Sequence, residues 1–180
     1  MYHLGNTDLL DDNPIAIYGS RDIPISVHNS VLSLVNPLME SPVTLAGGWQ
    51  SKLEKALLKA RRPGSPSNII YVLAKGIHSF RVSKSLRGDL DRGKVLIISP
   101  WMSDNRIDEK KVTKRDDFIL NQMGRFLFLH IREGGNLEEL FFRCLELGKE
   151  VFLLDDLTNE TWANPEVVSI SGKDLTPLIS

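Results

Sequence analysis

Short apolar stretches recur along the chain at a spacing that suits buried strands. Most are nearly continuous rather than alternating, which is typical of strands covered on both faces of a sheet. They are Pro14–Tyr18, Val43–Ala46, Asn68–Ala74, Lys94–Ser99, Arg125–Ile131 and Glu150–Leu154, with a weaker stretch at Val167–Ile170. We therefore expect six or seven mostly parallel strands, with the strand that ends at Tyr18 near the centre of the sheet.

The segments between these stretches have helical spacing. Apolar residues recur every three or four positions over 25–39, 51–61 and 136–148, and less regularly over 80–93. Ser51 and Glu54 have the spacing of a capping box, and Gly148 suits a helix C-terminus. Strands that alternate with helices predict an α/β fold: a single doubly wound, mostly parallel sheet with helices on both faces, in the Rossmann-like manner.

The 180 residues are enough for one domain with its own core. We expect the core over about 14–156, an irregular N-terminal segment over 1–12, and an irregular stretch over about 156–166. Polar composition predicts mobile loops at 61–68 and 103–113.

Composition excludes several classes of protein. The chain is 42% hydrophobic and 25% charged, which are globular values and exclude collagen, coiled coil and wholesale disorder. No apolar run approaches the roughly 18 residues of a membrane span, and the polar start is unlike a signal peptide. Cys144 has no second cysteine to pair with, so we expect a reducing, cytoplasmic location and no membrane partner.

Charge is unevenly distributed along the chain. Residues 41–115 carry 16 basic and six acidic side chains, whereas residues 116–180 carry five basic and 12 acidic ones. Within the middle block, the segment from Lys52 to Lys94 has 11 basic and three acidic residues. Such a block suits non-specific phosphate contacts, which charge reversal at Arg61 and Arg62 would weaken, or it forms ordinary solvated helix faces.

Glycine-containing junctions follow several predicted strands. Because ligands of open α/β sheets bind beyond the carboxyl ends of the strands, these junctions are candidates for a phosphate or nucleotide cradle. The candidate ligand-binding residues are Gly19, Ser20, Arg21, Gly47, Gly48, Arg115, Gly134, Gly135 and Asn136. We expect all of them to converge on one cleft.

Familiar cofactor and catalytic motifs are missing from the sequence. It has neither G-x-G-x-x-G after the first strand, nor a P-loop, nor G-x-S-x-G. His3, His28, His78 and His130 lie too far apart for a metal-binding motif. We expect no cofactor and no metal site.

Three side chains have two interpretations each. Arg21 either holds phosphate or pairs with Asp22, and Arg115 is either a second phosphate clamp or part of a solvated charge run. Arg115 is expected just before a helix that starts near Phe118. Glu139 is either a general acid or base, or the capping partner of Asn136.

Four further residues have simpler alternatives. Trp49 and Trp101 follow strand ends and either stack on a base or pack at the rim. His130 lies within a predicted strand and is expected to be a hydrogen-bonded core histidine. Cys144 lies on an apolar helix stripe and is expected to pack in the core.

Four segments in fixed order resemble motifs of the DNA-processing protein A (DprA, or Smf) family. They are IAIYGSR (15–21), VTLAGGWQSKLEKALLKA (43–60), RDDFILNQMGRFLFLHI (115–131) and GGNLEELFFRCLELGKEVFLL (134–154). The family has a strand followed by GSR, then SGxAxGID, then RNRIIxGLS and finally SGSLxTA. The resemblance implies a Rossmann-related fold and a role in DNA processing, uptake or recombination, with single-stranded DNA as ligand. The sequence departs from the family at Asp116 and Asp117, where the motif has Asn and Arg.

A sister family also resembles the last segment. Residues 135–139, GNLEE, are similar to the GTLEE of lysine-decarboxylase-like (LOG) nucleoside monophosphate phosphoribohydrolases. That resemblance implies catalysis by Glu139 and Arg115 on an N-glycosidic bond.

Three functions therefore remain open. The first is binding of single-stranded DNA or a nucleotide at the carboxyl edge of the sheet, the second is nucleotide hydrolysis, and the third is an interaction-only module. Related families pair commonly, and the apolar stretch from Glu150 needs cover, either from the chain's own tail or from a second chain. We also expect a homodimer, although none is required if the tail from Thr158 to Ser180 folds back over the sheet.

Overall fold

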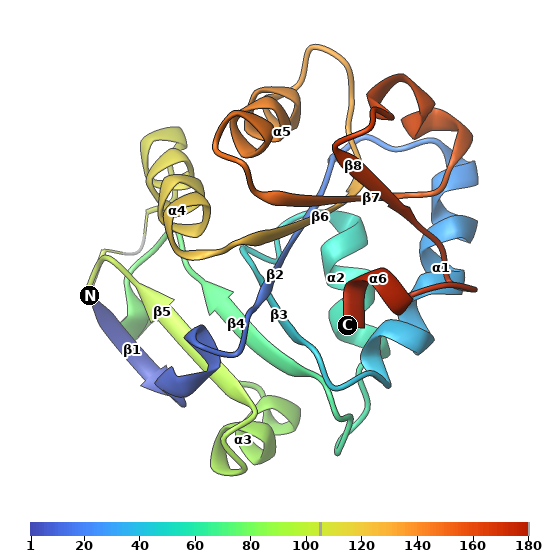
Figure 1. Cartoon of the computed structure of the whole chain (residues 1–180). Coiled ribbons are helices and arrows are strands. Elements are labelled where there is room, and N and C mark those ends of the chain that lie inside the picture. The colour runs from blue at the N-terminus through green and yellow to red at the C-terminus, as the bar shows by residue number, and fades with distance from the viewer. Residues whose placement is uncertain (105, 180) are drawn as a thin grey trace.

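A computed structural model describes residues 1–104 and 106–179, apart from the side chain of residue 85. It contains one eight-stranded sheet in the order β1-β5-β4-β3-β2-β6-β7-β8 (Figure 1). The strands are β1 (Tyr2–Gly5), β2 (Ile15–Gly19), β3 (Thr44–Gly47), β4 (Asn68–Val72), β5 (Val95–Ser99), β6 (Arg125–His130), β7 (Glu150–Leu154) and β8 (Val167–Ile170). All neighbours are parallel except β1 and β5. The predicted fold class is therefore confirmed, with β2 near the centre of the sheet.

Helices cover both faces of this sheet. The α-helices are α1 (Ile25–Met39), α2 (Lys52–Ala60), α3 (Lys84–Asp91), α4 (Glu109–Gln122), α5 (Asn136–Glu146) and α6 (Thr176–Ile179). The 3-10 helices are η1 (Thr7–Leu10), η2 (Ile77–Ser79) and η3 (Leu157–Trp162). The helices α1, α2, α3 and α6 pack on one face, and α4, α5, η1 and η3 pack on the other.

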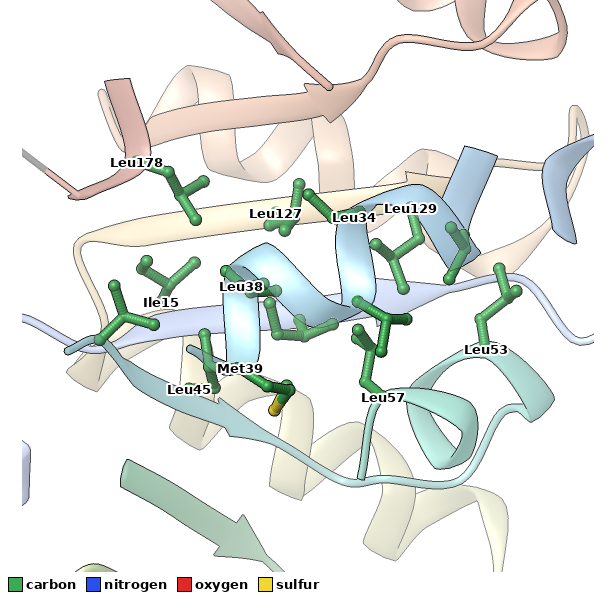
Figure 2. Close-up of a cluster of buried hydrophobic side chains, with 14 of the residues drawn as sticks. Ile15, Leu34, Leu38, Met39, Leu45, Leu53, Leu57, Leu127, Leu129 and Leu178 are labelled. Carbon is green, nitrogen blue, oxygen red and sulfur yellow. The ribbon is translucent and has the colours of Figure 1, made fainter. Parts of the chain in front are cut away.

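Each face has its own hydrophobic cluster because strand side chains alternate. In β2, Ile15 and Ile17 join the cluster under α1 and α2, while Ala16 and Tyr18 join the cluster under α4 and α5. Figure 2 shows Ile15 and Leu127 in the same cluster as Leu34 and Leu38 of α1. Two covered faces explain why the strand sequences are continuous apolar runs rather than alternating ones.

The number of strands differs from the six or seven expected, because β1 forms within the segment predicted to be irregular. All four of its residues are exposed, and β1 is joined to β5 by antiparallel backbone pairing at the sheet edge. An edge strand without buried side chains leaves no hydrophobic pattern to detect. Residues 157–162, also expected to be irregular, form η3.

Helix α4 starts earlier than expected. It begins at Glu109, where the Asp108 side chain accepts a hydrogen bond from the Lys111 amide. Arg115 therefore lies inside this helix and does not precede it, and the polar loop predicted over 103–113 ends at residue 108. Lys111 is buried and pairs with Asp104, so part of the apparent charge run is not solvated.

The C-terminal tail folds back onto the sheet. Leu175 and Leu178 are buried in the cluster under α1, and Arg125 Nη2 donates to the Leu178 carbonyl at 2.9 Å. The tail thus supplies the cover itself, and no second copy of the chain is required for it. Within the described residues, no helix combines the length and apolar character needed to cross a membrane.

Candidate functional site at the carboxyl edge of the sheet

Strand β2 lies at the point where the sheet reverses its order. Its neighbours are β3 on one side and β6 on the other. The chain leaves β2 through α1 on one face, and it enters β6 from α4 on the opposite face. In open α/β sheets the loops beyond the strand ends separate at such a point and leave a crevice for a ligand.

A cavity of about 410 Å³ occupies this crevice. Its walls come from the loop after β2, the loop after β6, and η3. The lining residues are Asp22, Ile23, Pro24, His130, Ile131, Arg132, Glu133, Thr158, Thr161 and Trp162. The volume lies in the range typical of small-molecule and cofactor sites.

Ser20 ties together the two loops that form the cavity. Its hydroxyl donates to the His130 carbonyl at 3.1 Å and accepts from the Arg132 amide at 2.9 Å. The Ser20 amide also donates to the His130 carbonyl, at 3.0 Å. Because Ser20 is buried and fully engaged, it positions the cavity walls and is not itself free to hold a phosphate.

An exposed arginine, Arg132, lies at the mouth of the cavity. Arg132 Nη1 is 3.2 Å from the Asp22 carboxylate, and both side chains are exposed, at 60% and 81%. An exposed ion pair of this kind contributes little stability, so a stronger anion can displace Asp22. The predicted alternative of an Arg21–Asp22 pair is wrong, since Asp22 pairs with Arg132, and Arg21 is exposed.

His130 is buried as expected but is not fully hydrogen-bonded. Its Nδ1 is enclosed and has no hydrogen-bond partner among the described residues. Burial lowers the pKa of His130, an effect that nearby Asp156 partly opposes. The prediction of a satisfied core histidine is therefore wrong at this atom.

The third wall of the cavity is rigid. Trp162 Nε1 donates to the Ile131 carbonyl at 3.1 Å, and the Trp162 ring packs edge-on against Phe141. Asn159 is buried and donates to the Leu129 and Leu154 carbonyls. Sequence reasoning missed these residues because they follow the last clear helix pattern, although a tryptophan in a polar segment was a usable signal.

A buried polar cluster lies beneath the end of β3. The Arg115 side chain is 7% exposed, and its Nε and Nη2 donate to Asp116 Oδ1 at 3.0 and 2.8 Å. A Cβ on Gly48 would collide with the Arg115 guanidinium, so a larger residue there requires the guanidinium to shift. Arg115 Nη1 is buried without a partner within the described part of the chain. The interpretation of Arg115 as a solvated charge is therefore wrong.

Tyr18 and Glu54 complete this cluster. Tyr18 donates its hydroxyl proton to Asp116 Oδ1 at 3.0 Å, and burial raises the pKa of Tyr18 well above its usual value. Burial also raises the pKa of Asp116, against the opposing effect of Arg115. Glu54 accepts from the Gln50 amide at 2.7 Å and forms the predicted capping box with Ser51. Burial raises the pKa of Glu54 as well.

The glycine turn before α5 forms without the predicted cap. Gly135 is the N-cap of α5 and makes no side-chain cap, and Asn136 is the first helical residue. Gly134 has a φ of +69° and donates its amide proton to the Glu138 carboxylate. Glu139 is exposed in the first turn of α5. The proposed capping box between Asn136 and Glu139 is therefore wrong.

The predicted site residues thus fall into separate groups. Gly19 and Ser20 lie beside the loop after β6, where β2 pairs with His130. Gly48 contacts Arg115. The cavity walls include none of the nine predicted ligand-binding residues, although Asp22, next to Arg21, does line the cavity. The predicted convergence of these residues on one cleft is therefore not observed at this cavity.

The two tryptophans at strand ends are both engaged in packing. Trp49 is buried and donates to the Ile70 carbonyl at 2.9 Å. Trp101 is partly buried, with the Lys111 ammonium 5.8 Å from its ring centroid.

Cys144 is buried as predicted, and burial raises its pKa to about 12. Across residues 1–104 and 106–179, no three metal-binding side chains are grouped to hold an ion.

Comparison with known proteins gives similarity in structure only. No family model matches the sequence, and no curated protein matches it. DNA processing protein A from Helicobacter pylori, described for its single-stranded DNA binding mode, superposes with a TM-score of 0.74 at 15% identity, over 99% of this chain and 84% of that one. DNA processing protein A from Streptococcus pneumoniae gives 0.76 at 18% identity, over 99% of this chain and 65% of that one.

A third structure is more distant. The molybdenum cofactor binding protein from Rippkaea orientalis gives a TM-score of 0.57 at 16% identity, over 93% of this chain and 95% of that one. The family resemblance that the sequence motifs predict is thus matched by the structures at the level of the backbone. The chain has the α/β fold of the DNA processing protein A structures.

Proposed function

We propose that this protein binds single-stranded DNA at the carboxyl edge of its sheet, with one nucleotide in the cavity between the loops after β2 and β6. The observation that carries the proposal is the cavity itself, which has nucleotide size and lies at the switch point. The fold of the DNA processing protein A structures supports single-stranded DNA as the ligand class.

The chemistry of the cavity suits a base more than a phosphate. Ile23, Pro24, Ile131 and Trp162 supply apolar wall, whereas the charged residues of the lining are one arginine and two acids. A base therefore fits inside, against these apolar side chains. The phosphates stay at the mouth, where Arg132 exchanges Asp22 for a phosphate oxygen and Arg21 is exposed nearby.

Substitution of Arg132 and of Arg21 tests this proposal. A hydrogen bond to a charged group contributes about 1.5–3 kcal/mol, so Arg132→Ala is expected to weaken binding of a labelled oligothymidylate roughly tenfold or more. Arg21→Ala is expected to weaken it as well. The control is Lys149→Ala, which removes the same charge at the opposite edge of the sheet, just before β7. Equal effects of all three substitutions in fluorescence anisotropy would contradict the proposal.

Nucleotide hydrolysis is the second candidate function. In this function Arg115 and Glu139 would act on the N-glycosidic bond. One observation favours it: Arg115 Nη1, which lies next to Gly48, is buried and has no hydrogen-bond partner among the described residues. Against it, Arg115 is already bound to Asp116 by two hydrogen bonds. Release of free base from nucleoside monophosphates, lost in Glu139→Gln, would favour this function over DNA binding.

The remaining expectations concern partners. A homodimer remains a prediction, and it is tested by whether light scattering gives twice the mass of the 20.2 kDa chain. An interaction-only role would be favoured if neither oligonucleotides nor nucleoside monophosphates bind.

A further inference from the structure

We infer that the exposed face of α2 is a second contact surface for nucleic acid, along which a strand bound at the carboxyl edge continues. Four exposed cations form this basic stripe: Lys52, Lys55, Lys59 and Arg62. The inference rests on the proposed function, because it assigns the path of the same strand outside the cavity.

The spacing of the three lysines places them on one side of the helix. Lys52, Lys55 and Lys59 are three and four residues apart, which is the repeat of one helix face, and Arg62 follows just beyond the end of α2. Leu53 and Leu57 are fully buried and fix the opposite side against the core. At 1.5 Å per residue the helical part of the stripe is about 10 Å long, which is long enough for more than one phosphate of an extended strand.

Few exposed acids oppose these cations. Between residues 52 and 94, Glu54 and Asp89 are buried and Asp91 is exposed. The Glu54 carboxylate is engaged by the Gln50 amide. Helix α1, which packs beside α2, carries no Lys, Arg, Asp or Glu. Glu40, just past the end of α1, is an exposed acid as well, so the four cations of the stripe outnumber the two exposed acids of these segments.

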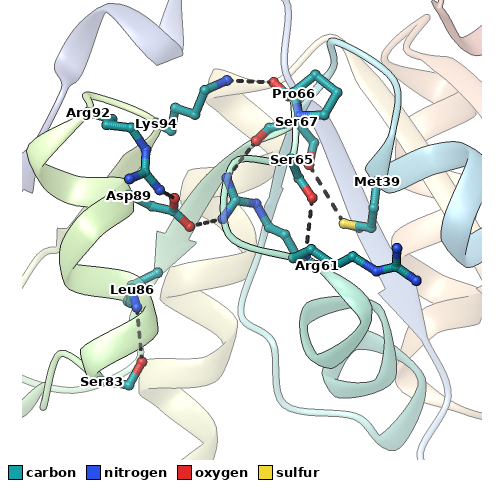
Figure 3. Close-up of polar contacts among 11 residues, drawn as sticks. Met39, Arg61, Ser65, Pro66, Ser67, Ser83, Leu86, Asp89, Arg92 and Lys94 are labelled. Atoms are coloured by element: carbon teal, nitrogen blue, oxygen red, sulfur yellow. Dashed lines mark hydrogen bonds and ion pairs between the residues drawn. The ribbon is translucent and has the colours of Figure 1, made fainter.

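A buried ion pair holds α3 beside α2. Arg61, at the end of α2, pairs with Asp89 of α3, and it also donates to the Ser67 carbonyl at 2.9 Å (Figure 3). Asp89 pairs with Arg92 as well. Through this contact α3 adds the exposed Lys84 and Arg87 to the same face of the molecule.

The role of Arg61 differs from the one predicted. Its side chain is 6% exposed and forms an ion pair with Asp89. The Arg61 guanidinium is therefore not available to bind phosphate. Charge reversal at Arg61 would disrupt the fold, so any loss of DNA binding in that variant would not identify Arg61 as a DNA contact. Arg62 is exposed and retains the predicted role.

The basic stripe begins next to the cavity. A Cβ on Gly19 would lie 3.2 Å from Leu53 Cδ1, so the first turn of α2 packs directly on the end of β2. Gly19 precedes Ser20, which ties the cavity loops together. A strand that leaves the cavity mouth therefore meets Lys52 first and can follow α2 toward the amino edge of the sheet.

A matched pair of double variants tests the inference. Lys55→Ala/Lys59→Ala removes two exposed lysines four residues apart on α2, and Lys110→Ala/Lys114→Ala removes two with the same spacing on α4, on the opposite face. None of the four takes part in an ion pair within the part of the chain that the structure describes. Circular dichroism confirms that each variant is folded.

Binding is measured by fluorescence anisotropy at several salt concentrations, with oligothymidylates of about 5 and about 20 nucleotides, one near the lower end of usual single-strand site sizes and one above their upper end. Each lost phosphate contact lowers the salt slope by about 0.7. For the longer strand, Lys55→Ala/Lys59→Ala is expected to lower the slope by about 1.4 and to weaken binding about tenfold at 0.15 M salt. The α4 pair is expected to leave the slope unchanged, and the shorter strand is expected to bind both variants like the wild type.

Two results overturn the inference in distinguishable ways. If the wild type binds the longer strand and the two double variants behave alike, the basic stripe on α2 is not a contact surface, while the proposed function stands. If the wild type binds neither oligonucleotide, the proposed function fails and this inference fails with it.

Discussion

Asp89→Ala removes the acid that holds α2 and α3 together. The Asp89 side chain is 4% exposed and accepts from both Arg61 and Arg92. Arg61 is itself buried, and its Nε has no hydrogen-bond partner among the described residues. Without the carboxylate, the Arg61 guanidinium keeps the Ser67 carbonyl as its acceptor. The substitution therefore leaves a buried cation without a counter-ion.

The expected loss of stability is large. Breaking a buried ion pair by removal of one partner costs about 3–5 kcal/mol. For a chain of this length, each kcal/mol lowers the melting temperature by about 2–4 °C. We therefore expect the melting temperature of Asp89→Ala to fall by roughly 10 °C, with a matching decrease in the free energy of unfolding from urea titrations.

Two further variants isolate the cause. Asp91→Ala removes an exposed acid from the same helix and is expected to change the free energy of unfolding by less than about 0.5 kcal/mol. Arg61→Met combined with Asp89→Leu removes both charges and is expected to recover most of the loss, because apolar replacement of a whole buried pair is often neutral. If Asp89→Ala lies within about 1 kcal/mol of the wild type, this account of the α2–α3 contact is refuted.

Two other substitutions test the carboxyl edge. Gly48→Ala places a Cβ 2.3 Å from the buried Arg115 guanidinium and is expected to cost about 1–3 kcal/mol, whereas Gly124→Ala, with open space around it, serves as the near-neutral control in the same urea titration. Burial lowers the pKa of His130 below its usual value of 6.5. As the pH falls below about 6.5, His130 is therefore protonated in the unfolded chain before it is protonated in the folded chain, and the free energy of unfolding decreases. His130→Gln is expected to have a shallower loss of stability between pH 7 and pH 5 in thermal melts, and an unchanged slope would show that His130 does not cause it.

Elements that bury a regular pattern of apolar side chains were predictable from the sequence. The expected strand over 150–154 and the expected helix over 25–39 coincide with β7 and α1. Strand β1 was missed because it is held by backbone pairing to β5, with its side chains in solvent. The start of α4 was missed because Lys111 is buried through contacts with Asp104 and the Arg106 carbonyl, and a sequence does not reveal which charges will find such partners.

The candidate site was predictable only in its location. Gly19 and Ser20 do lie at the switch point. The Ser20 hydroxyl, however, is hydrogen-bonded to the backbone of His130 and Arg132, so it holds the loop after β6 in place and does not face a ligand. Trp162 is 31 residues from Ile131 in sequence yet donates to its carbonyl across the cavity. Such long-range contacts depend on how the tail returns to the sheet, and local periodicity carries no information about that path.

A crystal structure of the protein with a short oligothymidylate tests the central claim most directly. The account predicts one nucleotide in the cavity beside His130, with a phosphate oxygen on Arg132 in place of Asp22. DNA bound elsewhere on the molecule, with the Arg132–Asp22 pair intact and the cavity unchanged, would contradict it.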